Sequence, residues 1–122
     1  MRMRLAGAVS EGSGPCNEDG FGFTGTADDV SAAWVFDGVT GINGRPYLPG
    51  VSDAQWFVRR ASSHLNTLAL GPTPLADILK QLVGFLTIDF AEATAGVTLP
   101  ADFDPPAACL VLAKRYGARW EV

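Results

Sequence analysis

Two consecutive helical patterns occupy the middle of the sequence, and short apolar runs of strand length lie on either side of them. The first helical pattern follows Ser52-Asp53-Ala54-Gln55, which has the form of a helix-capping box. The second follows Thr73-Pro74, with threonine as the expected cap and proline at the first helical position. Its apolar face is wide, which predicts burial on more than one side. Residues at helical spacing are Ala54, Phe57, Val58, Ala61, Leu65 and Leu68 in the first pattern, and Leu75, Ile78, Leu79, Leu82, Val83, Leu86 and Phe90 in the second.

Strand patterns precede and follow the helices. Residues 1–9 alternate apolar or small residues with arginine, and residues 21–23 and 32–36 are short apolar runs. After the helices, residues 107–113 are strongly apolar, and residues 119–122 open another strand beyond a turn. Strands, two helices and strands again predict an α+β fold, in which an antiparallel sheet is covered by a helix pair. We expect residues 1–122 to form a single domain.

Charge and cysteine content exclude several classes of partner. The formal net charge is -4, so the overall field does not attract nucleic acid or an anionic membrane surface. We find no apolar segment long enough to span a bilayer. The two cysteines, Cys16 and Cys109, are far apart and in no paired motif, which predicts free thiols in a reducing compartment. We therefore expect a cytoplasmic protein.

Acidic residues lie at two places where strands meet glycine-rich loops. Asn17-Glu18-Asp19 precedes the strand at 21–23, and Asp37-Gly38 ends the strand at 32–36. Hard divalent cations prefer oxygen ligands, which carboxylates and a glycine carbonyl would supply. A structural alternative stays open, because Asp-Gly is a common turn dipeptide and Asn-Glu-Asp suits a solvated loop.

The order of these motifs resembles the N-terminal half of a protein phosphatase 2C domain, most closely the bacterial members. That family folds as a β-sandwich with a helix pair on each outer face. It hydrolyses phosphoserine and phosphothreonine esters with two Mn²⁺ or Mg²⁺ ions, which activate a bridging water. The resemblance implies a phosphoprotein substrate. It rests on Asn17-Glu18-Asp19-Gly20-Phe21-Gly22, Trp34-Val35-Phe36-Asp37-Gly38-Val39-Thr40-Gly41, Ser52-Asp53-Ala54-Gln55-Trp56 and Pro106-Ala107-Ala108-Cys109-Leu110-Val111-Leu112.

The resemblance implies a role for four residues. Glu18 corresponds to the glutamate that ligates one metal ion, and Asp37 to the aspartate that bridges both ions. The carbonyl of Gly38 corresponds to a backbone ligand. Asp19 corresponds to the neighbouring acid that orders the metal's shell through hydrogen bonds.

Three departures from the family pattern lower the expected activity. Gly14 stands where the family often has a phosphate-binding arginine, and Arg45, in the loop after Asp37, is a candidate substitute. Val39 stands where many members carry a histidine. The family's remaining metal aspartates belong to the second half of its domain. We therefore expect a truncated sandwich, a weak metal site and impaired hydrolysis by this chain alone.

Two other interpretations stay open beside the enzyme. One is a catalytically inactive binding and assembly module, and the other is a fragment of a longer enzyme. A face without its second layer predicts self-association, so we expect a homo-oligomer, and first of all a dimer. Outside this site we expect His64 to have a packing role and Asp102 and Asp104 to be solvated loop residues.

Overall fold

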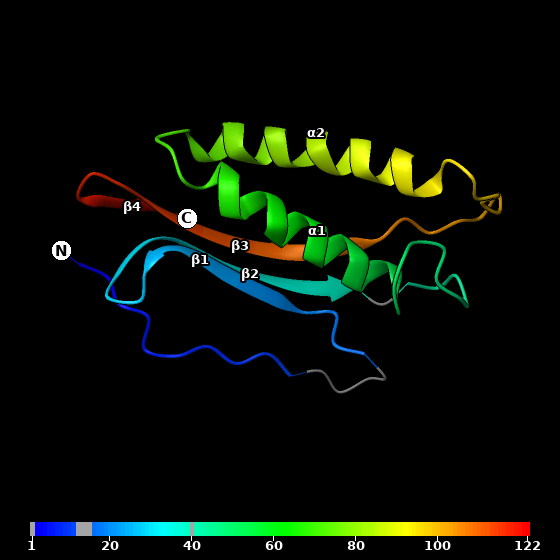
Figure 1. The fold of residues 1–122 in the computed structure, drawn as a ribbon, viewed down its shortest axis with the longest axis horizontal. Helices are drawn as coiled ribbons and strands as arrows, with labels where there is room; N and C mark the ends of the chain where they lie inside the picture. Colours follow the sequence, from blue (N-terminus) through cyan, green and yellow to red (C-terminus); the bar gives the residue numbers. More distant parts are fainter. Residues whose placement is uncertain (1, 12–15, 40) are drawn as a thin grey trace.

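The computed structural model describes residues 2–11, 16–39 and 41–122. Its elements follow the order β1 (Gly20–Thr26), β2 (Asp29–Val39), α1 (Asp53–Leu68), α2 (Leu75–Thr94), β3 (Ala107–Tyr116) and β4 (Arg119–Glu121). The four strands form one antiparallel sheet in the order β1-β2-β3-β4. Both helices lie on the same side of this sheet (Figure 1). The predicted α+β fold with a helix-covered antiparallel sheet is therefore confirmed.

Alternation along β2 divides the sheet into two faces. Every second residue from Val30 to Phe36 is buried, because strand side chains point alternately to opposite faces. We call the buried side the covered face. The other side, below the sheet in Figure 1, we call the open face. Its apolar and small residues include Phe21, Phe23, Ala33, Val35, Val39, Ala107, Cys109, Val111, Ala113 and Trp120.

Helix α1 lies directly on the covered face, where it contacts β1, β2 and β3, and α2 packs on α1. The Ser52 hydroxyl caps α1 by accepting a hydrogen bond from the Gln55 amide at 3.1 Å, as the capping box predicts. The core is built from β2, the two helices and Leu112 of β3. Its largest fully buried side chains are Trp34, Val58, Leu65 and Ile78.

The start of α2 differs from the prediction. Pro74, and not Thr73, is the N-cap residue, and no side chain caps this end. The Thr73 carbonyl instead accepts a hydrogen bond from the Tyr116 hydroxyl at 2.6 Å. The prediction that the wide apolar face of α2 is buried on more than one side is also wrong, since Leu79 and Val83 are 44% and 63% exposed.

The predicted first strand is wrong for the described residues 2–9, which lie outside the sheet. Two backbone hydrogen bonds join this segment to the β1–β2 hairpin, from the Leu5 amide to the Ala27 carbonyl and from the Val30 amide to the Met3 carbonyl. The segment then runs beneath the open face (Figure 1). Within residues 2–9 only Leu5 is half-buried, and it lines a cavity against the sheet.

The loops that follow β2 and precede β3 are joined. The Asn43 side-chain amide donates to the Asp104 carbonyl, and its Oδ1 accepts from the Asp104 amide, both at 2.8 Å. The Asp104 carboxylate also accepts a hydrogen bond from the Ile42 amide at 3.4 Å. The expectation that Asp104 is solvated is therefore wrong, whereas Asp102 is exposed. None of the described helices is long and apolar enough to cross a membrane.

Candidate metal centre

Glu18 and Gly38 meet where β1 begins and β2 ends. Gly20 pairs with Phe36 in the antiparallel register. Continuing that register beyond β1 places Asp19 opposite Asp37 and Glu18 opposite Gly38. The glycine environment agrees, because a Cβ atom added to Gly38 would collide with the Glu18 carbonyl oxygen. Only glycine allows this close approach, so the fold brings all four predicted site residues to one end of the sheet.

Hydrogen bonds hold the acidic loop in place from two sides. The Gln55 side chain does not close the capping box but donates to the Asn17 carbonyl at 3.1 Å. The Asn17 side chain accepts from the Asp19 amide at 3.0 Å and donates to the Ser10 hydroxyl at 2.8 Å. The start of α1 and the N-terminal segment therefore both position the loop that carries Glu18 and Asp19.

Glu18 and Arg45 line the same cavity, beside the first turn of α1. The cavity has a volume of about 320 Å³. The Arg45 guanidinium lies 4.5 Å from the centre of the Tyr47 ring, a distance suited to a cation–π contact. The Cys16 thiol lies 3.8 Å from a carboxylate oxygen of Glu18. The structure thus brings together the predicted metal ligand Glu18 and the candidate phosphate contact Arg45.

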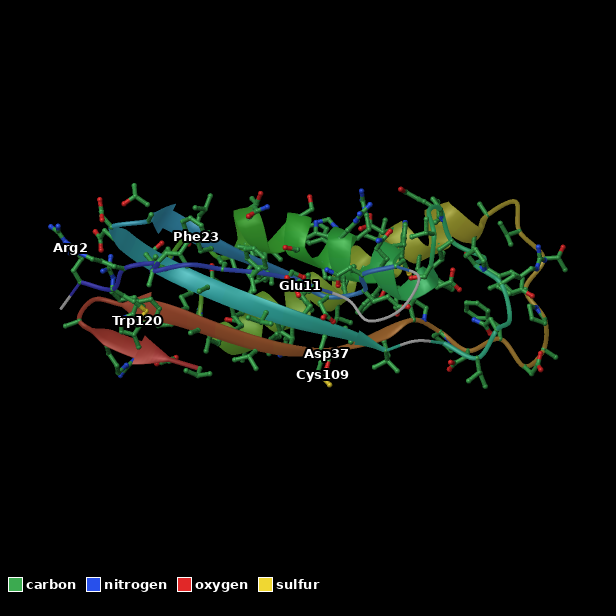
Figure 2. The ribbon with its side chains drawn as sticks, turned by 90° about the horizontal axis from the view of Figure 1, so that it is seen from below. Arg2, Glu11, Phe23, Asp37, Cys109 and Trp120 are labelled. Atoms are coloured by element: carbon green, nitrogen blue, oxygen red, sulfur yellow. The ribbon has the colours of Figure 1, made fainter. Side chains whose placement is uncertain are left out.

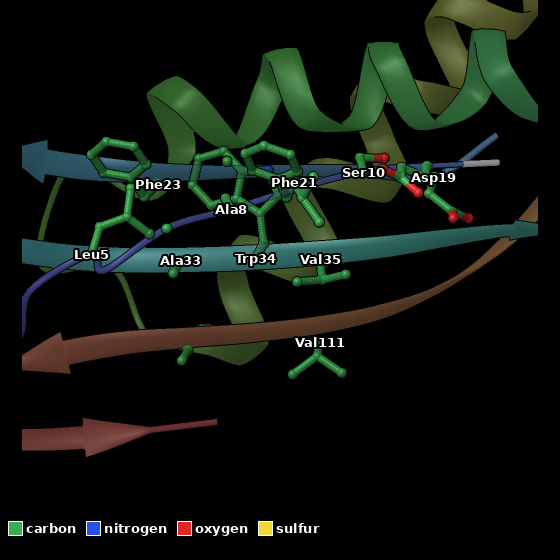
Figure 3. Close-up of a pocket in the computed structure, with 16 residues that line it drawn as sticks. Leu5, Ala8, Ser10, Asp19, Phe21, Phe23, Ala33, Trp34, Val35 and Val111 are labelled. Carbon is green, nitrogen blue, oxygen red and sulfur yellow. The ribbon is translucent and has the colours of Figure 1, made fainter. Parts of the chain in front are cut away.

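Asp19 and Asp37 belong to the open face. Asp19 lines a separate cavity of about 520 Å³ between the sheet and the N-terminal segment (Figure 3). Asp37 is exposed and pairs across the strands with Cys109 (Figure 2). Glu18 and Asp19 therefore line different cavities, and the carboxylates of Glu18 and Asp37 belong to opposite sides of the sheet, because adjacent residues of a strand face opposite sides.

The candidate donors are few, and they lie on both sides of the sheet. Glu18 and Asp37 offer carboxylates and Gly38 offers a carbonyl, all hard oxygen ligands. Within residues 2–11, 16–39 and 41–122 no group of three or more His, Cys, Asp or Glu side chains could hold a metal ion. Gly14, at the position of the family's arginine, lies outside the described residues, and Val39 is half-exposed.

A second polar cluster joins the two helices. Asp89 of α2 forms an ion pair with Arg60 of α1 at 2.8 Å and hydrogen-bonds to Nε2 of His64 at 2.6 Å. The neighbouring Arg60 guanidinium holds the pKa of the buried Asp89 carboxyl below its ordinary value, and His64 adds to this effect. His64 also stacks on Phe85 with ring centres 5.0 Å apart, in agreement with the expected packing role.

Sequence reasoning missed Asp89. The available signal was its position on the buried stripe of α2, after Ile78, Leu82 and Leu86. A buried carboxylate on an apolar stripe needs a partner, and arginine and histidine four residues apart on α1 supply it. This cluster lies between the helices and stabilises their contact.

Comparison of the chain with known protein families, with curated proteins and with solved structures found no match. The resemblance to phosphatase 2C therefore stays a prediction that rests on the motifs and on the geometry described above.

Proposed function

We propose that this chain is a phosphatase 2C-like domain that binds Mn²⁺ or Mg²⁺ weakly and acts on phosphoserine and phosphothreonine esters. The observation that carries the proposal is the contact of Gly38 with the Glu18 backbone, with Asp19 in register opposite Asp37. Four residues from two separate motifs meet there. A turn dipeptide and an unrelated solvated loop would not require a glycine to let the two backbones touch.

Each residue has a distinct task in this proposal. At the end of the sheet, Glu18 from the covered side, Asp37 from the open side and the Gly38 carbonyl would hold the cation, and the Asp19 carboxylate would orient water bound to it. A bound divalent cation would lower the pKa of a water molecule and neutralise phosphoryl oxygens. Arg45 would donate charged hydrogen bonds to the phosphate from the cavity that it shares with Glu18.

The small number of carboxylates determines how strongly we expect the metal ion to bind. Calcium- and magnesium-type sites lose affinity as charged ligands are removed, so two carboxylates and one carbonyl favour weak binding. The family's two-sheet sandwich belongs to the same proposal, with the open face covered by a further sheet, which a second copy of the chain would supply. It is supported by the apolar character of that face and by the helix pair on the opposite side.

The proposal is tested by titrating the chain with Mn²⁺ in a calorimeter while assaying hydrolysis of p-nitrophenyl phosphate. We expect a single weak binding event and slow, Mn²⁺-dependent turnover. Asp37→Asn should abolish both, because it removes the central carboxylate. Asp28→Asn is the matched control, since Asp28 is an exposed acid at the opposite end of β2's hairpin. It should leave binding and turnover unchanged.

The outcomes separate the competing interpretations. Binding without turnover would retain the metal site but remove the hydrolase activity, and would favour the assembly module. If Asp37→Asn and Asp28→Asn lost the same amount of binding heat, the heat would come from nonspecific attraction of Mn²⁺ to an acidic chain. No heat with the unmodified chain would contradict the metal site itself.

A further inference from the structure

The open face exposes apolar side chains at the centre of the sheet. Val35 and Val111 pair directly across β2 and β3, and they are 58% and 61% exposed. Phe21 and Val39 on the same face are 43% and 51% exposed. A contiguous apolar surface of this kind is uncommon on a monomer and marks an interaction site.

The N-terminal segment covers only part of this face. It passes beneath the sheet and leaves the cavity of about 520 Å³ between itself and Phe21, Val35 and Val111 (Figure 3). Val9, which lines this cavity, is itself 82% exposed. The segment therefore does not bury the apolar centre of the open face.

One end of the open face is acidic. Glu11 and Asp19 line the same cavity, and Asp37 lies exposed near them at the end of β2. Figure 2 looks onto this face and places Glu11 and Asp37 away from the end that carries Arg2. The three carboxylates give this end a formal charge of about -3 at neutral pH.

The opposite end carries an excess of positive charge. Arg115 and Asp29 neutralise each other in an ion pair of 2.9 Å. Arg2 and Arg4 then outnumber the exposed Asp28 at the hairpin. Arg2 also contributes to lowering the pKa of Asp29, which places it near this hairpin.

We propose that the open face binds the open face of a second copy of this chain, with the strands of the two sheets running in opposite directions. A two-fold axis then relates the two copies, so each end of one sheet meets the opposite end of the other sheet. Reversal places the acidic end of each copy over the arginine end of the other. A dimer with its strands in the same direction would place carboxylates over carboxylates, which is unfavourable. The apolar pair Val35–Val111 lies between the two ends and becomes the buried centre.

The size of the face limits the expected interface. Strands β1, β2 and β3 have 7, 11 and 10 residues. At ~3.3 Å for each residue and a strand spacing of ~4.8 Å they span roughly 440 Å² on each copy, including the part beneath the N-terminal segment. Such an area lies below the standard interface of about 800 Å² for each partner. We therefore expect a reversible dimer in the micromolar range, and this inference does not depend on metal binding or phosphatase activity.

Sedimentation of the full chain in metal-free buffer, from about 1 µM to about 500 µM, tests the dimer. The mass should rise from 12.8 kDa toward twice that value. Val35→Lys should raise the dissociation constant at least about tenfold, because it places a charge at the buried centre. Val83→Lys is the matched control: Val83 is 63% exposed, but it lies on α2, so the dissociation constant should not change.

A charge exchange tests the orientation. Glu11→Arg or Arg4→Glu alone should weaken the dimer, and the double variant should recover the unmodified dissociation constant. Circular dichroism confirms folding of each variant, and Val111→Lys replaces Val35→Lys if that variant unfolds.

A constant mass of 12.8 kDa over the whole concentration range would overturn the proposal. Equal weakening by Val35→Lys and Val83→Lys would assign the interface to the helices instead. Failure of the double variant to recover would reject the reversed orientation.

Discussion

The two faces of the sheet both carry apolar side chains, but their surroundings differ. On the covered face Trp34 and Phe36 are 2% and 3% exposed, beneath α1. On the open face their neighbour Val35 is 58% exposed. Both faces carry apolar side chains at their centre, so the amino-acid types alone do not separate the buried face from the exposed one. The difference comes from the helices, which the chain supplies to one face only within the described residues.

The same contrast explains how the candidate site residues are placed at one end of the sheet. Glycines allow close packing on the covered side, where a Cβ on Gly22 would meet the Trp34 ring and one on Gly38 would meet Glu18. At the end of β2, Asp37 turns to the open side, as strand alternation requires. The proposed metal centre therefore lies at the boundary between the two faces.

The largest expected effect comes from Trp34→Ala on the covered face. Trp34 is buried, and its indole donates a hydrogen bond to the Ser62 hydroxyl at 2.9 Å. Removing the ring should lower the free energy of unfolding by about 3–5 kcal/mol, measured by urea denaturation. Val35→Ala, at the neighbouring position, is the control. It should lower the free energy of unfolding by well under about 1 kcal/mol at low protein concentration. Similar losses in both variants would show that the two faces are equally packed.

An intermediate effect is expected for Asp89→Asn between the helices. Because Arg60 lowers the pKa of Asp89, the folded state favours the ionised carboxylate. Its stabilisation is present above the unfolded pKa of ~3.9 and disappears as pH falls through the folded value. The free energy of unfolding of the variant should be about 1–2 kcal/mol lower than that of the unmodified chain near neutral pH. In strong acid the two free energies should be equal.

Urea denaturation at a series of pH values measures this difference. Asp102→Asn, an exposed loop carboxylate, is the control and should show no such dependence. A difference between Asp89→Asn and the unmodified chain that persists in strong acid would show that Asp89 stabilises the helix pair by shape and not by charge.

The smallest effect is expected for Val111→Ala on the open face. Val111 is 61% exposed, so little apolar surface is buried in a single copy. At a concentration where the chain is monomeric, the free energy of unfolding should change by no more than about 0.5 kcal/mol. At high concentration the variant should become measurably less stable than the unmodified chain, because dimerisation stabilises the folded state. An equal change at both concentrations would contradict the open face as an interface.

Local patterns predicted most of the fold. The Ser52 cap, the helical spacing of Val58, Ala61 and Leu65, and the turn that precedes the last strand all recur in the structure. Contacts between segments far apart in the sequence could not be predicted from the local pattern of either segment. Gln55 bonds to Asn17 instead of completing its capping box, and residues 2–9 pack under the sheet instead of joining it.

The candidate site was predictable only in part. Gly38 was expected only as a carbonyl ligand of a metal ion, and its close approach to the Glu18 carbonyl appears only when β1 and β2 are in register. That Glu18 and Asp19 line different cavities follows from strand alternation once the register is known. Asp89 was missed because its partners lie on another helix.

Broadening of backbone amide signals by substoichiometric Mn²⁺ tests the proposed metal centre most directly, because this paramagnetic ion affects only amides near its binding site. We predict that the signals of Glu18, Asp19 and Gly38 broaden first, while those of Asp28 and Asp29 at the other end of the hairpin stay sharp. Broadening first at Asp28 and Asp29, or uniformly at every exposed carboxylate, would contradict a metal centre at the junction of β1 and β2.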